Sequence, residues 1–121
     1  MDARLLIYGC EKERRKLKAL CAQKNILCRV VAPADYGQSV GALCGVGQRR
    51  ETAVVTDVPD MLILAHFAPR QLESFLSALR TARLGIGTPK AVLTETNAAW
   101  DAATLAAELM RERAAVEGER A

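Results

Sequence analysis

The stretch KAVLTETNAAW, at residues 90–100, decides how the rest of the chain can fold. Residues 91–93 are apolar and are predicted to form a short buried strand. The polar elbow that follows, at residues 94–97, carries hydroxyl, carboxylate and amide groups. Such side chains cap helices and satisfy tight turns, and they also contact ligands at the end of a strand. The sequence leaves both interpretations open, and in the first one Trp100 packs beneath the turn.

Three more apolar runs upstream of this stretch are predicted to be strands. They are residues 4–8, 26–32 and 60–67. Helices are predicted at residues 11–24 and 36–44, a third helix begins at Pro69, and Asp101 caps the last one. Residues 46–59 are polar and irregular and are predicted to be an exposed loop.

The alternation of strands and helices predicts βαβ units with right-handed crossovers. The expected fold is a small three-layer α/β sandwich, with a four-stranded, mostly parallel sheet of order 2-1-3-4 and helices on both faces. A chain of 121 residues supports one hydrophobic core, so residues 1–117 are predicted to form a single α/β domain. Residues 118–121 are predicted to be a frayed tail.

Composition limits the classes of partner. The net charge of +3 is too small to predict a nucleic-acid partner without a concentrated basic patch. No segment approaches the roughly 20 apolar residues that span a bilayer, and the N-terminus lacks the features of a signal peptide. A cytoplasmic protein without a membrane partner is expected.

The four cysteines and the single histidine, His66, do not form a metal-binding pattern. Cys10, Cys21, Cys28 and Cys44 contain no CxxC pair, and zinc sites usually need ligands two to four residues apart. Cysteines in apolar runs behave as small hydrophobic residues. We therefore expect reduced, mostly structural cysteines, and neither a metal nor a cofactor.

Four stretches carry a resemblance: LLIYG at residues 5–9, SVGALCG at 39–45, DMLILAHFAPRQLESFLSALR at 60–80 and KAVLTETNAAW at 90–100. Together they resemble the Domain of Unknown Function 3783 family, which consists of small bacterial proteins without an assigned activity. The resemblance runs from residue 5 to about residue 109 and is weakest at 46–59. Its most specific part is a strand, then TxTN-x-x-W, then a helix. The chain departs from the family at Cys10, where a large apolar residue is usual, and in starting its last helix Asp-x-x-Thr. The resemblance implies the fold and supplies no catalytic residue.

Candidate site residues follow the ends of the predicted strands. In a parallel sheet the carboxyl ends of neighbouring strands share one edge, where ligands bind. Gly9 and Cys10 follow the first strand, His66 follows the third and Glu95 follows the fourth. Cys10, His66 and Glu95 are therefore predicted to line up across neighbouring strands, in the order of an activated cysteine nucleophile. The alternative is that they are ordinary strand-end residues with Glu95 in solvent.

The sequence favours a non-catalytic binding or regulatory module over an enzyme. The module would recognise a protein partner or a small ligand at the carboxyl edge of the sheet. The predicted ligand-binding residues are Gly9, Cys10, His66, Thr94, Glu95, Thr96 and Asn97. The alternative function is a minimal cysteine-dependent enzyme with Cys10 as nucleophile and His66 as base.

Overall fold

The fold is a four-stranded α/β domain, as predicted. The computed structural model describes residues 2–49 and 57–120, with side chains described up to residue 114. The strands are β1 (Arg4–Tyr8), β2 (Leu27–Val30), β3 (Met61–Ala65) and β4 (Lys90–Val92), each shorter than or equal to its predicted run. They form one sheet in the order β2-β1-β3-β4, so the predicted strand order is confirmed.

The sheet is mixed, because its central pair runs antiparallel. β1 is parallel to β2 and β3 is parallel to β4, so two of the three pairings are parallel. β1 and β3 are antiparallel, with Tyr8 opposite Met61 and Arg4 opposite Ala65. The sheet thus consists of two βαβ units joined back to back in opposite directions. This arrangement decides which strand ends share an edge.

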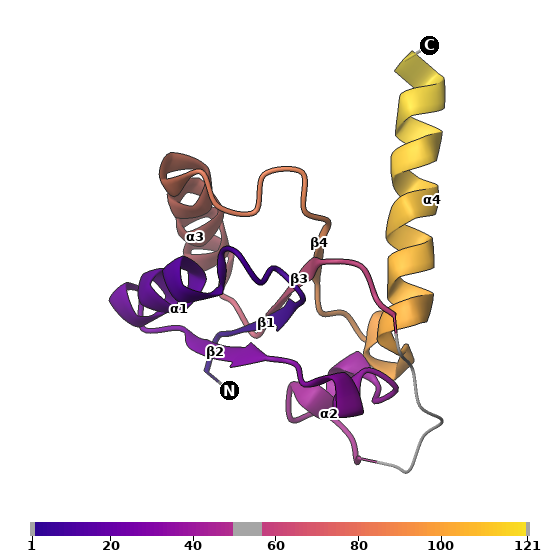
Figure 1. Ribbon diagram of the computed structural model, residues 1–121, viewed down its shortest axis with the longest axis horizontal. Helices are drawn as coiled ribbons and strands as arrows, with labels where there is room; N and C mark the ends of the chain where they lie inside the picture. Colours follow the sequence, from indigo (N-terminus) through magenta and orange to yellow (C-terminus); the bar gives the residue numbers. More distant parts are fainter. Residues whose placement is uncertain (1, 50–56, 121) are drawn as a thin grey trace.

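Helices cover both faces of the sheet, which completes the predicted three layers (Figure 1). α1 (Arg14–Gln23) and α3 (Pro69–Ala82) pack on one face, and α2 (Val40–Leu43) and α4 (Ala102–Arg120) pack on the other. Alternate residues of β1 serve the two cores, as the period of a strand requires. Leu5 and Ile7 pack with α1 and α3, whereas Leu6 and Tyr8 pack with α2 and α4.

The predicted helix at residues 36–44 is only partly correct. A 3-10 turn, η1, occupies Pro33–Asp35, and the α-helix is limited to Val40–Leu43. Ser39 caps this short helix by accepting a hydrogen bond from the amide of Ala42 at 3.2 Å. A Cβ atom on Gly41 would lie 2.7 Å from the carbonyl oxygen of Ala98, so the absence of a side chain there lets α2 approach the segment after β4.

α4 is the longest helix, and its C-terminal part extends beyond the sheet (Figure 1). It contacts the core through its first turns, where Ala102, Leu105 and Ala106 are buried. The predicted end of the domain at residue 117 stays a prediction. No helix in the described part of the chain is long and apolar enough to cross a membrane. Residues 50–56 of the predicted loop lie outside the described residues.

Candidate functional site

Cys10 and His66 lie at opposite edges of the sheet, so their predicted alignment is wrong. Cys10 follows β1, and its amide donates a hydrogen bond to Asp60, which directly precedes β3. His66 follows β3 at the other end of that strand. Asp60 and His66 are separated by the length of β3, about 20 Å at roughly 3.3 Å per residue. Glu95 follows β4, which is parallel to β3, and therefore shares an edge with His66 only.

The surroundings of Cys10 keep its thiol protonated. The side chain is buried, and its Sγ donates to the carbonyl oxygen of Tyr8 at 3.5 Å. Burial raises the pKa of the Cys10 thiol to about 11, and the carboxylates of Asp60 and Glu13 act in the same direction. An activated cysteine needs the reverse, a positive or protonated partner that lowers the pKa.

The turn that holds Cys10 is built around Asp60. Gly9 and Cys10 both have positive φ angles, of 68° and 55°. The Asp60 carboxylate accepts the Cys10 amide at 3.0 Å, and Arg14 donates from Nε to the carbonyl oxygen of Gly9 at 2.9 Å. The side chains of Asp60 and Arg14 therefore stabilise this turn.

His66 stabilises the end of α2. Its Nε2 lies 3.0 Å from the carbonyl oxygen of Cys44, the residue that ends the helix. A carbonyl can only accept, so Nε2 carries a proton in this contact. Arg4 donates to the neighbouring carbonyl of Leu43 at 3.2 Å. The two side chains thus satisfy carbonyls that a helix end leaves without partners.

The elbow is a closed hydrogen-bonded turn, as one of its two interpretations predicted. The Thr94 amide donates to Oδ1 of Asn97 at 2.8 Å, and the Asn97 amide donates to Oγ1 of Thr94 at 3.1 Å. Asn97 is buried and also donates from Nδ2 to the carbonyl oxygen of Val92 at 3.0 Å. The side chains of Thr94 and Asn97 are therefore engaged by the backbone. Glu95 and Thr96 are exposed on the outside of the turn.

Trp100 ties this turn to the rest of the domain. Asn97 begins a 3-10 turn, η2 (Asn97–Ala99), and the Trp100 amide closes it on the carbonyl oxygen of Asn97 at 3.0 Å. The carbonyl oxygen of Trp100 accepts from the amide of Val40 at 2.8 Å, at the start of α2. The indole is partly buried and packs against the α2 and α4 core. The elbow, α2 and the start of α4 are therefore joined at one place.

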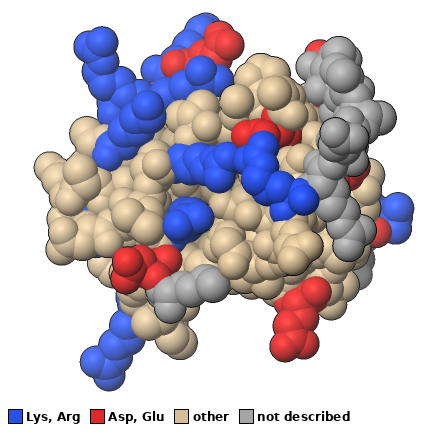
Figure 2. Space-filling view, turned by 90° about the horizontal axis from the view of Figure 1, so that it is seen from below, with Lys and Arg blue, Asp and Glu red and all other residues tan. Residues whose placement is uncertain are grey.

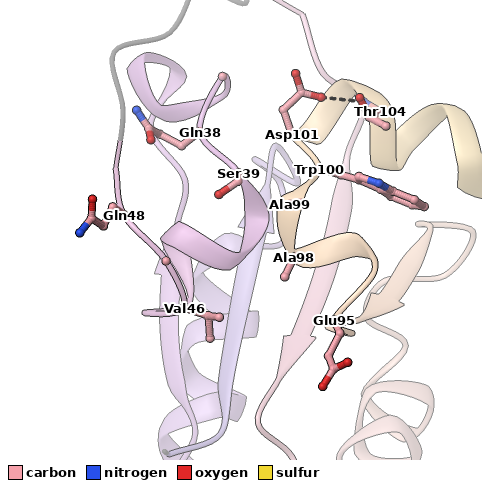
Figure 3. A pocket seen from close by; sticks show the side chains of 12 residues that line it. Gln38, Ser39, Val46, Gln48, Glu95, Ala98, Ala99, Trp100, Asp101 and Thr104 are labelled. Atoms are coloured by element: carbon pink, nitrogen blue, oxygen red, sulfur yellow. Dashed lines mark hydrogen bonds between the residues drawn. The ribbon is translucent and has the colours of Figure 1, made fainter.

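The space between these elements is a cavity of about 570 Å³, which we call the elbow pocket (Figure 3). Its lining residues are Gly37, Gln38, Ser39, Val46, Gly47, Gln48, Glu95, Ala98, Ala99, Trp100, Asp101 and Thr104. Glu95 and Asp101 are the acidic residues of this lining, and Figure 3 shows them at opposite ends of the pocket; the described lining contains no Lys or Arg. One oxygen of Asp101 caps α4 by accepting the Thr104 amide at 2.9 Å, as Figure 3 shows.

The predicted ligand-binding residues border three separate hollows. Glu95 alone lines the elbow pocket. Gly9 and Cys10 line a cavity of about 630 Å³ at the opposite edge of the sheet. The elbow residues Thr94, Thr96 and Asn97 line a groove of about 340 Å³ between β4 and α4. His66 lines none of these three hollows.

Sequence reasoning missed most of the elbow pocket, although a signal for it was present. Ser39 and Asp101 are the N-caps of α2 and α4, and both line the pocket. Capping residues can be recognised from sequence, but the meeting of two helix starts beside the elbow depends on tertiary packing. Gln38 is also buried, and no local sequence pattern around it predicts that it lines a pocket.

Basic side chains also gather on another surface of the molecule, and two of them form ion pairs with one carboxylate. Figure 2 views the molecule from below, the side on which Figure 1 places β2 and α2, and shows Lys and Arg side chains across the middle of this face. The Asp35 carboxylate pairs with Arg29 at 3.1 Å and with Arg49. These contacts hold η1 against β2 and against the segment that follows α2. Within the residues that the structure describes, no group of three or more His, Cys, Asp or Glu side chains could hold a metal ion.

Residues 60–116 match a protein family described as "Domain of unknown function (DUF3783)". Residues 60–116 form a DUF3783 domain. The match spans β3, α3, β4, the elbow and most of α4, and it confirms the resemblance for these residues. The DUF3783 domain contributes Glu95, Asp101 and Thr104 to the elbow pocket, whereas Gln38 and Ser39 precede it. No curated protein and no solved structure matches the chain.

Proposed function

We propose that this protein is a non-catalytic binding module whose elbow pocket accepts a primary amine or a guanidinium group. The observation that carries the proposal is the lining of the pocket, in which two carboxylates occur without a described Lys or Arg. The volume of about 570 Å³ falls in the range of small-ligand sites, roughly 300–1,000 Å³. Glu95, which follows β4, lines this pocket. The proposal therefore retains the binding role that the sequence predicted for the carboxyl ends of the strands.

The charge of the two carboxylates supports a cationic ligand. Glu95 is exposed and makes no ion pair with a described residue. Asp101 uses Oδ1 for the helix cap, and its other oxygen can accept from a ligand. Amines and guanidinium groups only donate hydrogen bonds, which suits carboxylate, hydroxyl and amide oxygens. Binding by such a partly open site is expected to weaken as salt rises.

The same chemistry can come from a free metabolite or from a Lys or Arg side chain of a protein partner. Either ligand is compatible with a protein that binds its partner and catalyses no reaction. The buried thiol of Cys10, whose pKa is raised and whose nearest carboxylates oppose ionisation, supports the non-catalytic proposal. The cytoplasm is the compartment we propose, since all four cysteines are unpaired.

The proposal can be tested with agmatine, a small molecule that carries both an amine and a guanidinium group. Titration followed by amide NMR should shift signals of Ser39, Glu95 and Thr104. Glu95→Gln and Asp101→Asn should each weaken binding at least about fivefold through loss of charge, and Asn retains helix-capping ability. Glu73→Gln, on the exposed face of α3, is the matched control and should bind like the native protein.

Two further ligands separate the possible sources and define failure. An uncharged alcohol of the same length should leave the spectrum unchanged. A Lys- or Arg-containing peptide that binds at least tenfold more tightly than agmatine would assign the site to a protein partner. If agmatine and the peptides shift no signal of the elbow pocket, or if Glu95→Gln binds like Glu73→Gln, the proposal is wrong.

A further inference from the structure

Two of the four cysteines, Cys21 and Cys28, lie next to each other on α1 and β2. Cys21 is in the last turn of α1 and is fully buried, and Cys28 is the second residue of β2 and is partly buried. The connection between them is tight, because the Ile26 amide donates to the carbonyl oxygen of Cys21 at 2.9 Å. The start of β2 is therefore fixed against the last turn of the helix.

The register of the sheet turns Cys28 toward Cys21. Cys28 is opposite Leu5 of the parallel neighbour β1, and Leu5 belongs to the core beneath α1. Ile26 packs in the same core, two residues before Cys28, as the period of a strand requires. Both cysteine side chains pack in this core, so the two thiols lie on the same side of the sheet.

The two thiols differ in exposure and in the direction in which their pKa values shift. A hydrogen bond donated by the Cys21 thiol would stabilise the Cys28 thiolate and lowers the pKa of Cys28, burial opposes this effect, and Lys18 lowers the pKa further. The same hydrogen bond and burial raise the pKa of Cys21. A partly exposed thiol that ionises first, beside a buried second thiol, has the arrangement of a reactive cysteine with a resolving partner.

We propose that Cys21 and Cys28 form a reversible dithiol–disulfide pair that is oxidised by peroxides. The Cys28 thiolate attacks one oxygen of a hydroperoxide, the O–O bond breaks, and the leaving oxygen takes a proton to become an alcohol or water. This leaves a sulfenic acid on Cys28. The Cys21 sulfur then attacks the Cys28 sulfur, the S–S bond forms, and hydroxide leaves with the Cys21 proton as water. Two thiols and one hydroperoxide thus yield a disulfide, one alcohol or water, and one water.

Cys10 and Cys44 provide an internal comparison. Both are buried, and burial raises the pKa of each thiol to about 11. Neither has a hydrogen bond to another thiol. Thiolates react with peroxides and thiols hardly do, so Cys10 and Cys44 should react far more slowly than Cys28.

The test is oxidation of the full chain with hydrogen peroxide, followed by alkylation and trypsin digestion. Cleavage after Lys18, Lys24 and Arg29 gives peptides of residues 19–24 and 25–29, each with one cysteine. We expect these two peptides to be joined, the intact mass to fall by about 2 Da through loss of two hydrogens, and dithiothreitol to restore both thiols. The joined peptides should be absent from Cys21→Ser and Cys28→Ser and present in Cys10→Ala and Cys44→Ala.

Trapping the intermediate distinguishes the roles of the two residues. In Cys21→Ser a sulfenic acid should persist on Cys28, and dimedone should label it at least tenfold more than in the native chain. The proposal fails if peroxide leaves Cys21 and Cys28 free to alkylate in the native chain. It also fails if Cys28 proceeds to sulfinic acid without joined peptides, or if Cys10 and Cys44 are oxidised as fast as Cys28.

Discussion

Thr94 and Asn97 exchange two hydrogen bonds, each donating its backbone amide to the side-chain oxygen of the other. This reciprocal pair closes the turn between β4 and η2. Asn97 adds a third contact from Nδ2 to the carbonyl oxygen of Val92. Because Asn97 is buried, water cannot replace these partners without cost.

Asn97→Ala should therefore destabilise the domain by about 2–4 kcal/mol, since it leaves the Thr94 amide and the Val92 carbonyl without their partners. Urea unfolding followed by circular dichroism measures this loss. The control is Thr96→Ala, at an exposed neighbouring position, which should change stability by less than about 0.5 kcal/mol. Equal effects of the two substitutions would contradict the structural role of Asn97.

Gly9→Ala should be more disruptive than Gly87→Ala, although both glycines have positive φ angles, of 68° and 75°. A Cβ on Gly9 would lie 2.1 Å from Oδ1 of Asp60, whereas a Cβ on Gly87 meets nothing within 4 Å. Gly87→Ala should cost about 1 kcal/mol for the left-handed backbone alone. Gly9→Ala should cost at least about 1 kcal/mol more, because the Asp60 carboxylate must move. Parallel urea titrations give the difference, and similar midpoints would exclude the contact with Asp60.

The layers and strand order could be predicted because they depend on patterns that are local in sequence. The apolar run at β3 and the amphipathic helix α3 identify a buried strand and its covering helix wherever they lie in the fold. The Thr94–Asn97 turn was also accessible, since Thr and Asn side chains bond to backbone only a few residues away. These features need no knowledge of distant contacts.

The direction of β3 relative to β1 could not be read in the same way. A continuous apolar run shows that both faces of a strand are buried. The same run is expected whether the neighbouring strand is parallel or antiparallel. The direction is decided by the long connection between β2 and β3. The predicted alignment of Cys10 with His66 failed for this reason alone. The packing of Cys21 and Cys28 in one core was not predicted, because neither position has a recognised spacing motif.

Buried thiols should make the domain less stable in alkaline solution. Burial raises the pKa of Cys10 and of Cys44 from 9.0 to about 11. The unfolded chain therefore releases these protons first as the pH rises, and the folded state loses stability. This stability is fully present below about pH 9 and is lost between about pH 9 and 11, on the order of 2 kcal/mol per thiol.

Urea unfolding at intervals from pH 7 to pH 10.5 tests this prediction under reducing conditions. The variant with Cys10→Ala and Cys44→Ala should show a smaller decrease above pH 9 than the native chain. Tyr8 should also lower the stability of the fold as the pH rises, at higher pH than the thiols, because burial raises the pKa of its hydroxyl. Equal alkaline slopes for the native chain and the variant would show that these thiols are not buried as neutral groups.

Tyr8 offers a substitution that should stabilise the protein. The residue is fully buried, and its hydroxyl has no hydrogen-bond partner in the described part of the chain. Its ring lies beside Tyr36, with centroids 6.0 Å apart, so the aromatic contact does not need the hydroxyl. Tyr8→Phe keeps this packing and removes the desolvation cost of the hydroxyl. Stability should rise by about 1 kcal/mol, measured as an increased urea midpoint at pH 7.

Tyr36→Phe is the matched control, because the Tyr36 side chain is only partly buried and water can reach it. It should change stability by less than about 0.5 kcal/mol. A loss of stability in Tyr8→Phe would mean that the hydroxyl bonds to an ordered internal water. That result would place a polar centre beside Arg29 and Asp35, whose charges both act on the Tyr8 hydroxyl. A gain would establish that the Tyr8 ring is held at this site by packing alone.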